Sequence, residues 1–295
     1  MKFLIGTLAL IAIALFLFTR LVAPPLQLDL LDRFWPGEGA ERLAENVAFD
    51  EENGLALDVW GKAAPAGAKK PVLVFFYGGG WANGERAHYG FAARAYANRG
   101  FVVVVPDYRK VPAVRFPSFN EDGAAALRWT HDNIARYGGD PERILLAGHS
   151  AGAYIAVMLA LDRHYLQKTG VNPSVIRGVA GLSGPYDFYP FDSKRSIAAM
   201  SAWPWPAETQ PVNFVRKDAP PVLVITGTED DTVKPRNAII LSRELNKLGA
   251  PAEFRAYEGL KHEDTVMALS LPFRSKAPVL QDSADFLMKA SKEQR

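Results

Sequence analysis

The sequence predicts an α/β fold in which one doubly wound, mostly parallel sheet carries helices on both faces. Short, continuous runs of β-branched and aromatic residues, such as 71–76 and 101–105, are typical of strands buried on both sides. Segments with a helical spacing of apolar residues, such as 122–137, alternate with these runs. Because no linker interrupts the alternation after Pro25, we expect a single domain over residues 26–295.

The predicted elements follow one another in a regular order. The run 55–60 alternates weakly between apolar and polar residues and is expected to be the entry strand. Helices are expected where apolar residues share one helical face and a glycine or proline ends the pattern. The expected strands are 55–60, 71–76, 101–105, 144–147, 175–182, 221–226 and 254–257, and the expected helices are 122–137, 153–161, 235–248 and 280–289.

Composition narrows the classes of function. The chain has 295 residues and a formal net charge of +2, which gives no indication of a nucleic-acid partner. It contains no cysteine, which excludes disulfide bonds, thiolate metal sites and a cysteine nucleophile. No group of residues has metal-ligand spacing, so we expect neither a metal nor another cofactor. The sequence indicates no oligomeric state.

The N-terminus carries a long apolar run. Lys2 precedes sixteen uncharged, mostly apolar residues, 3–18, and Arg20 follows them. A membrane-spanning helix needs about 17–25 such residues and a signal-peptide core about 7–15, so the run lies between the two. We expect residues 1–23 to be an uncleaved membrane anchor that ends before Pro24, with the folded domain outside the cytoplasm. A cleaved signal peptide and a buried helix are the alternatives.

The segment 144–161 is the part around which the chain is organised. A predicted strand runs directly into the motif GHSAG at 148–152, and a predicted helix follows. This order is typical of a nucleophile elbow, a tight and strained turn that exposes a serine. Gly148 and Gly152 lack the Cβ atoms that would collide in such a turn. We therefore expect Ser150 to be a nucleophile; an ordinary turn with a helix-capping serine is the alternative.

A serine nucleophile needs a base, usually a histidine that a carboxylate orients. On a sheet of this type the order along the chain is serine, acid, histidine, each after a strand. Among the five histidines, His262 is the one that follows a late strand, and it is the expected base. A histidine on a surface loop is the alternative. His149 belongs to the turn itself, and its side chain is expected to point the wrong way to deprotonate Ser150.

Four carboxylates are candidates for the acid. Glu229, Asp230 and Asp231 follow the predicted strand 221–226, and Asp187 follows the strand before it. An acidic turn on the surface is the ordinary alternative for each of them. Position along the chain does not choose among the four.

Backbone N–H groups that could stabilise an oxyanion occur in two places. The glycines 78–80 follow the predicted strand 71–76, in the loop that completes such a site in enzymes with a nucleophile elbow. Ala151 supplies the amide that follows the nucleophile. No Lys-Ser or Lys-Thr pair follows the glycines, which disfavours a phosphate-binding loop.

Five motifs occur in order between residues 55 and 262: YGGGW (77–81), PDYR (106–109), DPERILLAGHSAG (140–152), GTEDDTV (227–233) and GLKH (259–262). Together they resemble the α/β-hydrolase superfamily, in the esterase/lipase branch that includes hormone-sensitive lipase and bacterial carboxylesterases. The sequence is also similar to kynurenine formamidases. The resemblance implies an α/β-hydrolase catalytic domain over residues 26–295, with a small cap inserted in the sheet's connections.

The resemblance also assigns residues. The family pattern G-x-x-D-x-x-V aligns on 227–233 and implies that Asp230 is the acid. The family's H-G-G-G loop aligns on the glycine triplet and implies oxyanion donors at Gly79 and Gly80, beside the amide of Ala151. Tyr77 stands where that loop has histidine, so the orientation of the loop is open.

The segment 186–214 is rich in aromatic residues and proline and falls between two late strands, where such folds insert a cap. We expect it to line an apolar acyl or aryl pocket, and a packed surface loop is the alternative.

The sequence thus predicts a serine hydrolase that cleaves small-molecule carboxylic esters through an acyl-enzyme, with Ser150, His262 and Asp230 as its triad. Amide cleavage, by a formamidase or small peptidase, uses the same groups and is one alternative. A non-catalytic, membrane-tethered binding module on the same fold is another.

Overall fold

The computed structural model describes residues 18–35, 39–62, 67 and 69–293. Most of the predicted membrane anchor, 1–23, therefore lies outside the described residues. Among the described helices, none has the length and apolar character needed to cross a bilayer.

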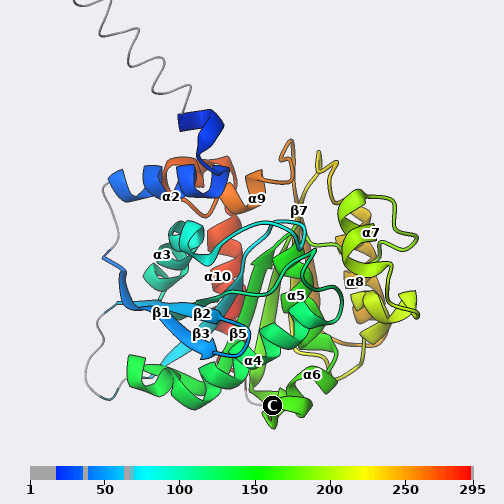
Figure 1. Cartoon of the computed structure of the whole chain (residues 1–295), viewed down its shortest axis with the longest axis horizontal. Coiled ribbons are helices and arrows are strands. Elements are labelled where there is room, and N and C mark those ends of the chain that lie inside the picture. The colour runs from blue at the N-terminus through cyan, green and yellow to red at the C-terminus, as the bar shows by residue number, and fades with distance from the viewer. Residues whose placement is uncertain (1–17, 36–38, 63–66, 68, 294–295) are drawn as a thin grey trace, which may run out of the picture.

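The described part of the chain forms one eight-stranded sheet with the order β1-β2-β4-β3-β5-β6-β7-β8. The strands from β4 to β8 are parallel, and β1 and β2 form an antiparallel edge. This mostly parallel sheet, with helices on both faces, confirms the predicted fold class (Figure 1). The strands are β1 (Glu41–Asp50), β2 (Leu55–Gly61), β3 (Lys70–Phe76), β4 (Val102–Pro106), β5 (Gly139–His149), β6 (Ile176–Leu182), β7 (Val222–Gly227) and β8 (Ala252–Tyr257).

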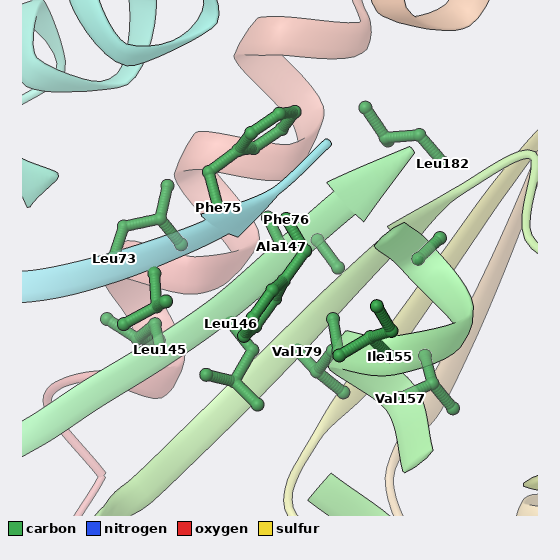
Figure 2. Packing of buried hydrophobic residues seen from close by; sticks show 14 of the residues in the cluster. Leu73, Phe75, Phe76, Leu145, Leu146, Ala147, Ile155, Val157, Val179 and Leu182 are labelled. Atoms are coloured by element: carbon green, nitrogen blue, oxygen red, sulfur yellow. The ribbon is translucent and has the colours of Figure 1, made fainter. Parts of the chain in front are cut away.

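Helices form the outer layers. The α-helices are α2 (Pro24–Phe34), α3 (Gly90–Asn98), α4 (Ser118–Asn133), α5 (Ala151–Leu161), α6 (His164–Thr169), α7 (Lys194–Met200), α8 (Arg236–Lys247), α9 (Asp264–Met267) and α10 (Val279–Ala290). Short 3-10 helices lie at Arg86–Tyr89, Ile134–Tyr137, Pro173–Val175, Pro206–Thr209, Pro211–Phe214 and Leu271–Lys276. Figure 2 shows the central strands between α10 on one face and α5 on the other.

The core lies on both faces of the central strands. Residues from Val72 to Phe76 in β3 are fully buried, as expected for a parallel strand that is covered on both sides. Side chains along each strand alternate between the two faces of the sheet. On one face, a Cβ on Gly178 of β6 would approach Leu145 of β5 and helix α10. On the other face, Phe76 of β3 lies beside α4 and α5. Helix α5 is buried along its whole length, which explains its continuous apolar sequence.

Strand register sets the position of the candidate site. Phe76 at the end of β3 lies opposite Gly148 of β5, and His149 lies opposite Leu182 of β6. The segments that follow these three strands therefore leave the sheet at the same edge. In open parallel sheets this carboxyl edge is where ligands bind.

The chain is already helical at the expected boundary between the N-terminal segment and the domain. Pro24 and Pro25 begin helix α2, because proline is well accommodated in the first turn, where backbone N–H groups need no partner within the helix. The helix packs on α3, where Arg94 binds the buried carboxylates of Asp29 and Asp32 at 2.9 and 2.6 Å. The predicted start of the domain, residue 26, thus falls inside a docked helix.

Candidate active site

Ser150 occupies a strained turn between β5 and α5. Its φ and ψ angles are 55° and −121°, a conformation that costs a residue with a side chain about 1–3 kcal/mol. The two flanking glycines are required by close contact. A Cβ on Gly148 would lie 2.4 Å from the carbonyl oxygen of Gly152, and a Cβ on Gly152 would lie 2.1 Å from that of Phe76. This confirms the predicted elbow geometry.

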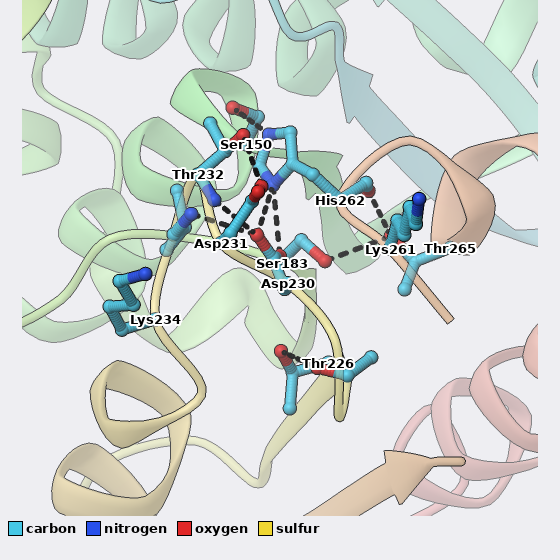
Figure 3. A network of polar contacts seen from close by, with 12 residues as sticks. Ser150, Ser183, Thr226, Asp230, Asp231, Thr232, Lys234, Lys261, His262 and Thr265 are labelled. Atoms are coloured by element: carbon cyan, nitrogen blue, oxygen red, sulfur yellow. Dashed lines mark hydrogen bonds and ion pairs between the residues drawn. The ribbon is translucent and has the colours of Figure 1, made fainter. Parts of the chain in front are cut away.

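The side chains of Ser150, His262 and Asp230 form a continuous hydrogen-bonded chain (Figure 3). His262 Nε2 lies 2.9 Å from Ser150 Oγ, and His262 Nδ1 lies 2.9 and 3.1 Å from the two oxygens of Asp230. His262 and Asp230 are buried, whereas Ser150 is partly accessible from a pocket. The structure therefore brings together the three residues that the sequence singled out.

The carboxylate of Asp230 is held by several donors. The backbone N–H groups of Thr232 and Val233 donate to Oδ1 at 3.1 and 2.8 Å, and the Ser183 hydroxyl donates as well. Burial by itself would raise the pKa of Asp230, but the hydrogen bond and charge of His262 and these donors lower it below its ordinary value. Asp230 is therefore held as the carboxylate.

The other candidate acids lie elsewhere. Glu229 and Asp231 are exposed, and in the described part of the chain Asp230 is the one candidate that contacts His262. Asp187 uses its backbone carbonyl to accept a hydrogen bond from Arg236. Position along the chain could not separate the four, whereas the hydrogen bonds do.

His149 has a structural function that the sequence analysis did not assign. Its side chain is buried beneath the turn, and its Nε2 donates to the backbone carbonyl of His262 at 3.0 Å. Burial, with the nearby His262 as a smaller cause, lowers the pKa of His149 to about 3. A neutral His149 thus fixes the backbone that carries His262, and no spacing rule pointed to this contact.

The predicted oxyanion loop lies beside the elbow. Gly80 and Ala151 line the same pocket as Ser150, and the N–H groups of Gly79 and Gly80 donate no hydrogen bond within the described part of the chain. Gly79 has a φ of 139°, and a Cβ there would lie 2.1 Å from the carbonyl oxygen of Asn83, so only glycine fits.

Tyr77 supports this loop from below. Its ring stacks on Tyr108 at 4.6 Å and on Tyr89 at 5.5 Å, and its hydroxyl accepts a hydrogen bond from Lys110 at 3.0 Å. The Tyr108 hydroxyl donates to the Tyr77 carbonyl at 3.0 Å. Tyr77, the departure from the family motif, is fully buried and packs within the fold.

The pocket above Ser150 has a volume of about 850 Å³. From the aromatic segment 186–214, Phe188 lines it and stacks on Trp81 at 6.0 Å. Tyr186 is fully buried, and Trp203 lines a different cavity of about 350 Å³. The prediction that the segment's aromatic residues line the pocket is therefore right for Phe188 and wrong for most of the others, which pack against one another.

Charged side chains make up much of the remaining lining, which the sequence analysis did not anticipate. We call the four cations the basic wall: Lys194, Arg195, Lys234 and Arg236. Their sequence signal is two basic pairs: one forms the first two residues of α7, and the other flanks Pro235 at the start of α8. These helices follow β6 and β7, the strands that also precede the candidate acids. Among the described residues, no cluster of three or more histidine and carboxylate side chains is arranged to hold a metal.

Comparison with known sequences gives a family. The profile of the family described as BD-FAE matches residues 57–245. The esterase LipC of Mycobacterium tuberculosis is 29% identical over 210 residues, which cover 65% of this chain and 52% of LipC. The probable isoprenylcysteine alpha-carbonyl methylesterase ICMEL1 of Oryza sativa subsp. japonica is 28% identical over 248 residues, which cover 76% of this chain and 58% of that protein. The chain spans about half the length of these curated relatives.

Solved structures share the fold. The truncated form of a carbohydrate esterase from gut microbiota aligns with a TM-score of 0.72 at 22% identity and covers 87% of this chain and 97% of that one. The butyrate-bound esterase Est2 of Thermogutta terrifontis aligns with a TM-score of 0.68 at 21% identity and covers 85% of this chain and 94% of that one. At these identities the likeness concerns the fold, and it agrees with the predicted α/β-hydrolase architecture.

Proposed function

This chain belongs to the BD-FAE family, among the α/β-hydrolase esterases and lipases, and from that premise we propose that it cleaves small-molecule carboxylic esters through an acyl-enzyme. The observation that carries the proposal is the hydrogen-bonded chain from Ser150 through His262 to Asp230 at a strained elbow. A serine that only capped a helix would need neither the strain nor the buried histidine and carboxylate behind it.

In the acylation step His262 Nε2 takes the proton of the Ser150 hydroxyl while Oγ bonds to the ester carbonyl carbon. The carbonyl π electrons move to oxygen and form a tetrahedral oxyanion. When this intermediate collapses, the bond to the alcohol oxygen breaks, and His262 gives its proton to the leaving alcohol. Ser150 is left as an acyl ester.

In the deacylation step a water molecule takes the place of the alcohol. His262 accepts a proton from that water while the water oxygen bonds to the acyl carbon. His262 then returns the proton to Ser150 Oγ as the bond between Oγ and the acyl carbon breaks and the acid leaves. Asp230 keeps the Nδ1–H tautomer in place and stabilises the imidazolium in both steps, which its lowered pKa supports. The N–H groups of Gly79, Gly80 and Ala151 stabilise the oxyanion.

The test is hydrolysis by the purified full-length chain of nitrophenyl esters of increasing acyl length. We expect turnover that falls to the background rate in Ser150→Ala, with an unchanged circular dichroism spectrum and melting temperature. Turnover of formyl amides or peptides in place of esters would favour the amide-hydrolase alternative. Equal inertness of both proteins on every substrate would favour a binding module.

We also propose that residues 1–23 attach the protein to a membrane, with the hydrolase domain outside the cytoplasm. The apolar run of the sequence supports this, as does the exposure of Leu21, Phe34 and Trp35 at 78%, 87% and 54% in the part of the chain that follows. We expect the protein to sediment with membranes after a high-salt wash. We also expect added protease to digest it in cells whose outer barrier is permeabilised but whose cytoplasmic membrane is intact. Recovery in the soluble cytoplasmic fraction would contradict the proposal.

A further inference from the structure

Six charged side chains line the pocket that contains Ser150, and cations outnumber carboxylates. The cations are those of the basic wall, Lys194, Arg195, Lys234 and Arg236, and the carboxylates are Asp192 and Asp231. An excess of positive charge does not favour the binding of neutral apolar esters. An apolar substrate would remove water from part of these cations, which costs solvation energy. The excess itself therefore requires an explanation.

The four cations of the basic wall are exposed to solvent and have no ion-pair partner in the described part of the chain. Within the described residues none of the four forms an ion pair, and Arg236 donates only to the backbone carbonyl of Asp187, at 3.3 Å. Arg94 and Arg109, which are partly covered, are paired by contrast: Arg94 with Asp29 and Asp32, and Arg109 with Asp122 at 2.6 Å. The cations of the basic wall are thus available to a charged ligand.

Two positions bear on what the charges do. The stem of Arg195 packs over the oxyanion loop, where a Cβ on Gly80 would lie 2.4 Å from its Cδ and 3.2 Å from its Nε. Arg195 is therefore close to the place where a substrate on Ser150 would lie. Lys234 and Arg236 stand at the start of the twelve-residue helix α8, whose first turn has no acidic residue. Cations at that end oppose the helix dipole and lower stability, which indicates a use other than folding.

We propose that the natural ester carries a negatively charged group, such as a carboxylate, in its acyl or alcohol part, and that the basic wall binds this group. This inference rests on the proposed esterase function and specifies its substrate class. The anion pairs with Arg195 and with Lys234 or Arg236 and holds the ester carbonyl against Ser150. Asp192 and Asp231 reduce the affinity for a free anion, so that the ester must also fill the pocket.

The experiment compares two matched ester pairs on the full-length protein. In the first pair, the nitrophenyl monoester of adipic acid and nitrophenyl hexanoate differ by a carboxylate in place of a methyl group at the end of the acyl chain. In the second, 3-carboxyphenyl and 3-carbamoylphenyl butyrate differ by a carboxylate on the alcohol part. For each pair the readout is the ratio of kcat/KM, charged over neutral, after subtraction of the uncatalysed rate.

We expect a ratio of about ten or more in one pair, because an anion that pairs with two exposed cations gains up to about fivefold from each. The pair that gives this ratio also identifies the part of the ester that bears the charge. Arg195→Gln and Lys234→Gln are each expected to lower the ratio about threefold or more. The matched control is Lys217→Gln, which removes an exposed lysine outside the pocket and should leave the ratio unchanged.

Two results would overturn the inference in distinguishable ways. If the neutral esters are hydrolysed and neither pair gives a ratio above one, or Lys217→Gln lowers the ratio as much as Arg195→Gln, the anionic substrate class is wrong and the esterase function stands. If no ester of either pair is hydrolysed, the proposed function fails, and the inference fails with it.

Discussion

The two walls of the pocket differ in whether their polar groups have partners within the protein. On the triad wall, where Ser150 lines the pocket and His262, Asp230 and His149 are buried behind it, every ring nitrogen of His262 and both oxygens of Asp230 have partners. On the basic wall, four cations lie without a carboxylate partner among the described residues. The triad wall is complete before a substrate arrives, whereas the basic wall is not.

This difference separates two properties of one site. Reaction chemistry requires groups that are already in position, because reorganisation during the reaction raises the barrier. Substrate choice requires groups whose partners come from the ligand. A change on the triad wall should therefore abolish turnover of every ester, while a change on the basic wall should alter which ester is preferred.

The largest effect is expected from Asp230→Asn. An asparagine leaves the geometry in place but cannot hold the Nδ1–H tautomer of His262 or stabilise its positive charge, so kcat should fall about 10⁴-fold on charged and neutral esters alike. Steady-state kinetics on both esters checks this. Glu229→Gln, which alters the neighbouring exposed acid, is the control and should retain kcat. The reverse pattern would assign the acid to Glu229.

A smaller effect concerns stability and pH. In the folded protein the pKa of His149 is about 3, against an ordinary value of 6.5, so the unfolded chain binds a proton that the folded chain excludes. The stability contribution is complete above pH 6.5 and is lost as the pH falls toward 3. Between pH 7.5 and pH 5 the free energy of unfolding should drop by about 2 kcal/mol on account of His149.

Urea unfolding at the two pH values measures this drop. His149→Gln keeps a donor for the His262 carbonyl but does not titrate, so its drop should be smaller by about 2 kcal/mol. His131→Gln changes a partly exposed histidine on α4 and should behave like the wild type. If His149→Gln shows the wild-type pH dependence, the buried neutral His149 is not the source of the acid sensitivity.

The smallest effect is expected from ionic strength, which should change turnover that depends on the basic wall but not turnover that depends on the triad wall alone. Raising the ionic strength from about 0.01 M to 0.5 M screens exposed charges, so kcat/KM for the preferred charged ester should fall about threefold to tenfold. For the neutral ester of the same pair it should change less than about twofold. Initial rates at a series of salt concentrations supply the comparison. If kcat/KM depends equally on salt for both esters, the cations of the basic wall do not bind the charged group of the substrate.

The triad wall could be predicted from sequence to a large extent, because its parts are tied to local patterns. The motif at 148–152 specifies a turn whose geometry only glycines allow, and the order of strands placed His262 at the same sheet edge. The choice of Asp230 among four carboxylates needed the family resemblance, because it depends on hydrogen bonds between residues 32 positions apart.

Other features depend on contacts that no local pattern records. Helix α2 begins at Pro24, and its docking depends on Arg94, far along the sequence, which supplies charge for the helix's buried carboxylates. Strand β1 has an irregular exposure pattern, with register shifts against β2, and gave no periodic signal. The basic wall joins residues from α7, from α8 and from the turn before α8, which only the fold brings together.

The measurement that tests the central claim most directly is covalent trapping of Ser150. The full-length protein would be treated with a nitrophenyl alkylphosphonate, which a serine nucleophile attacks with release of nitrophenol, and the adduct located by peptide mass spectrometry. The account predicts one equivalent of nitrophenol, an adduct on Ser150, loss of esterase activity in proportion, and no adduct in Ser150→Ala. An adduct on another residue, or esterase activity that persists when Ser150 is fully modified, would contradict it.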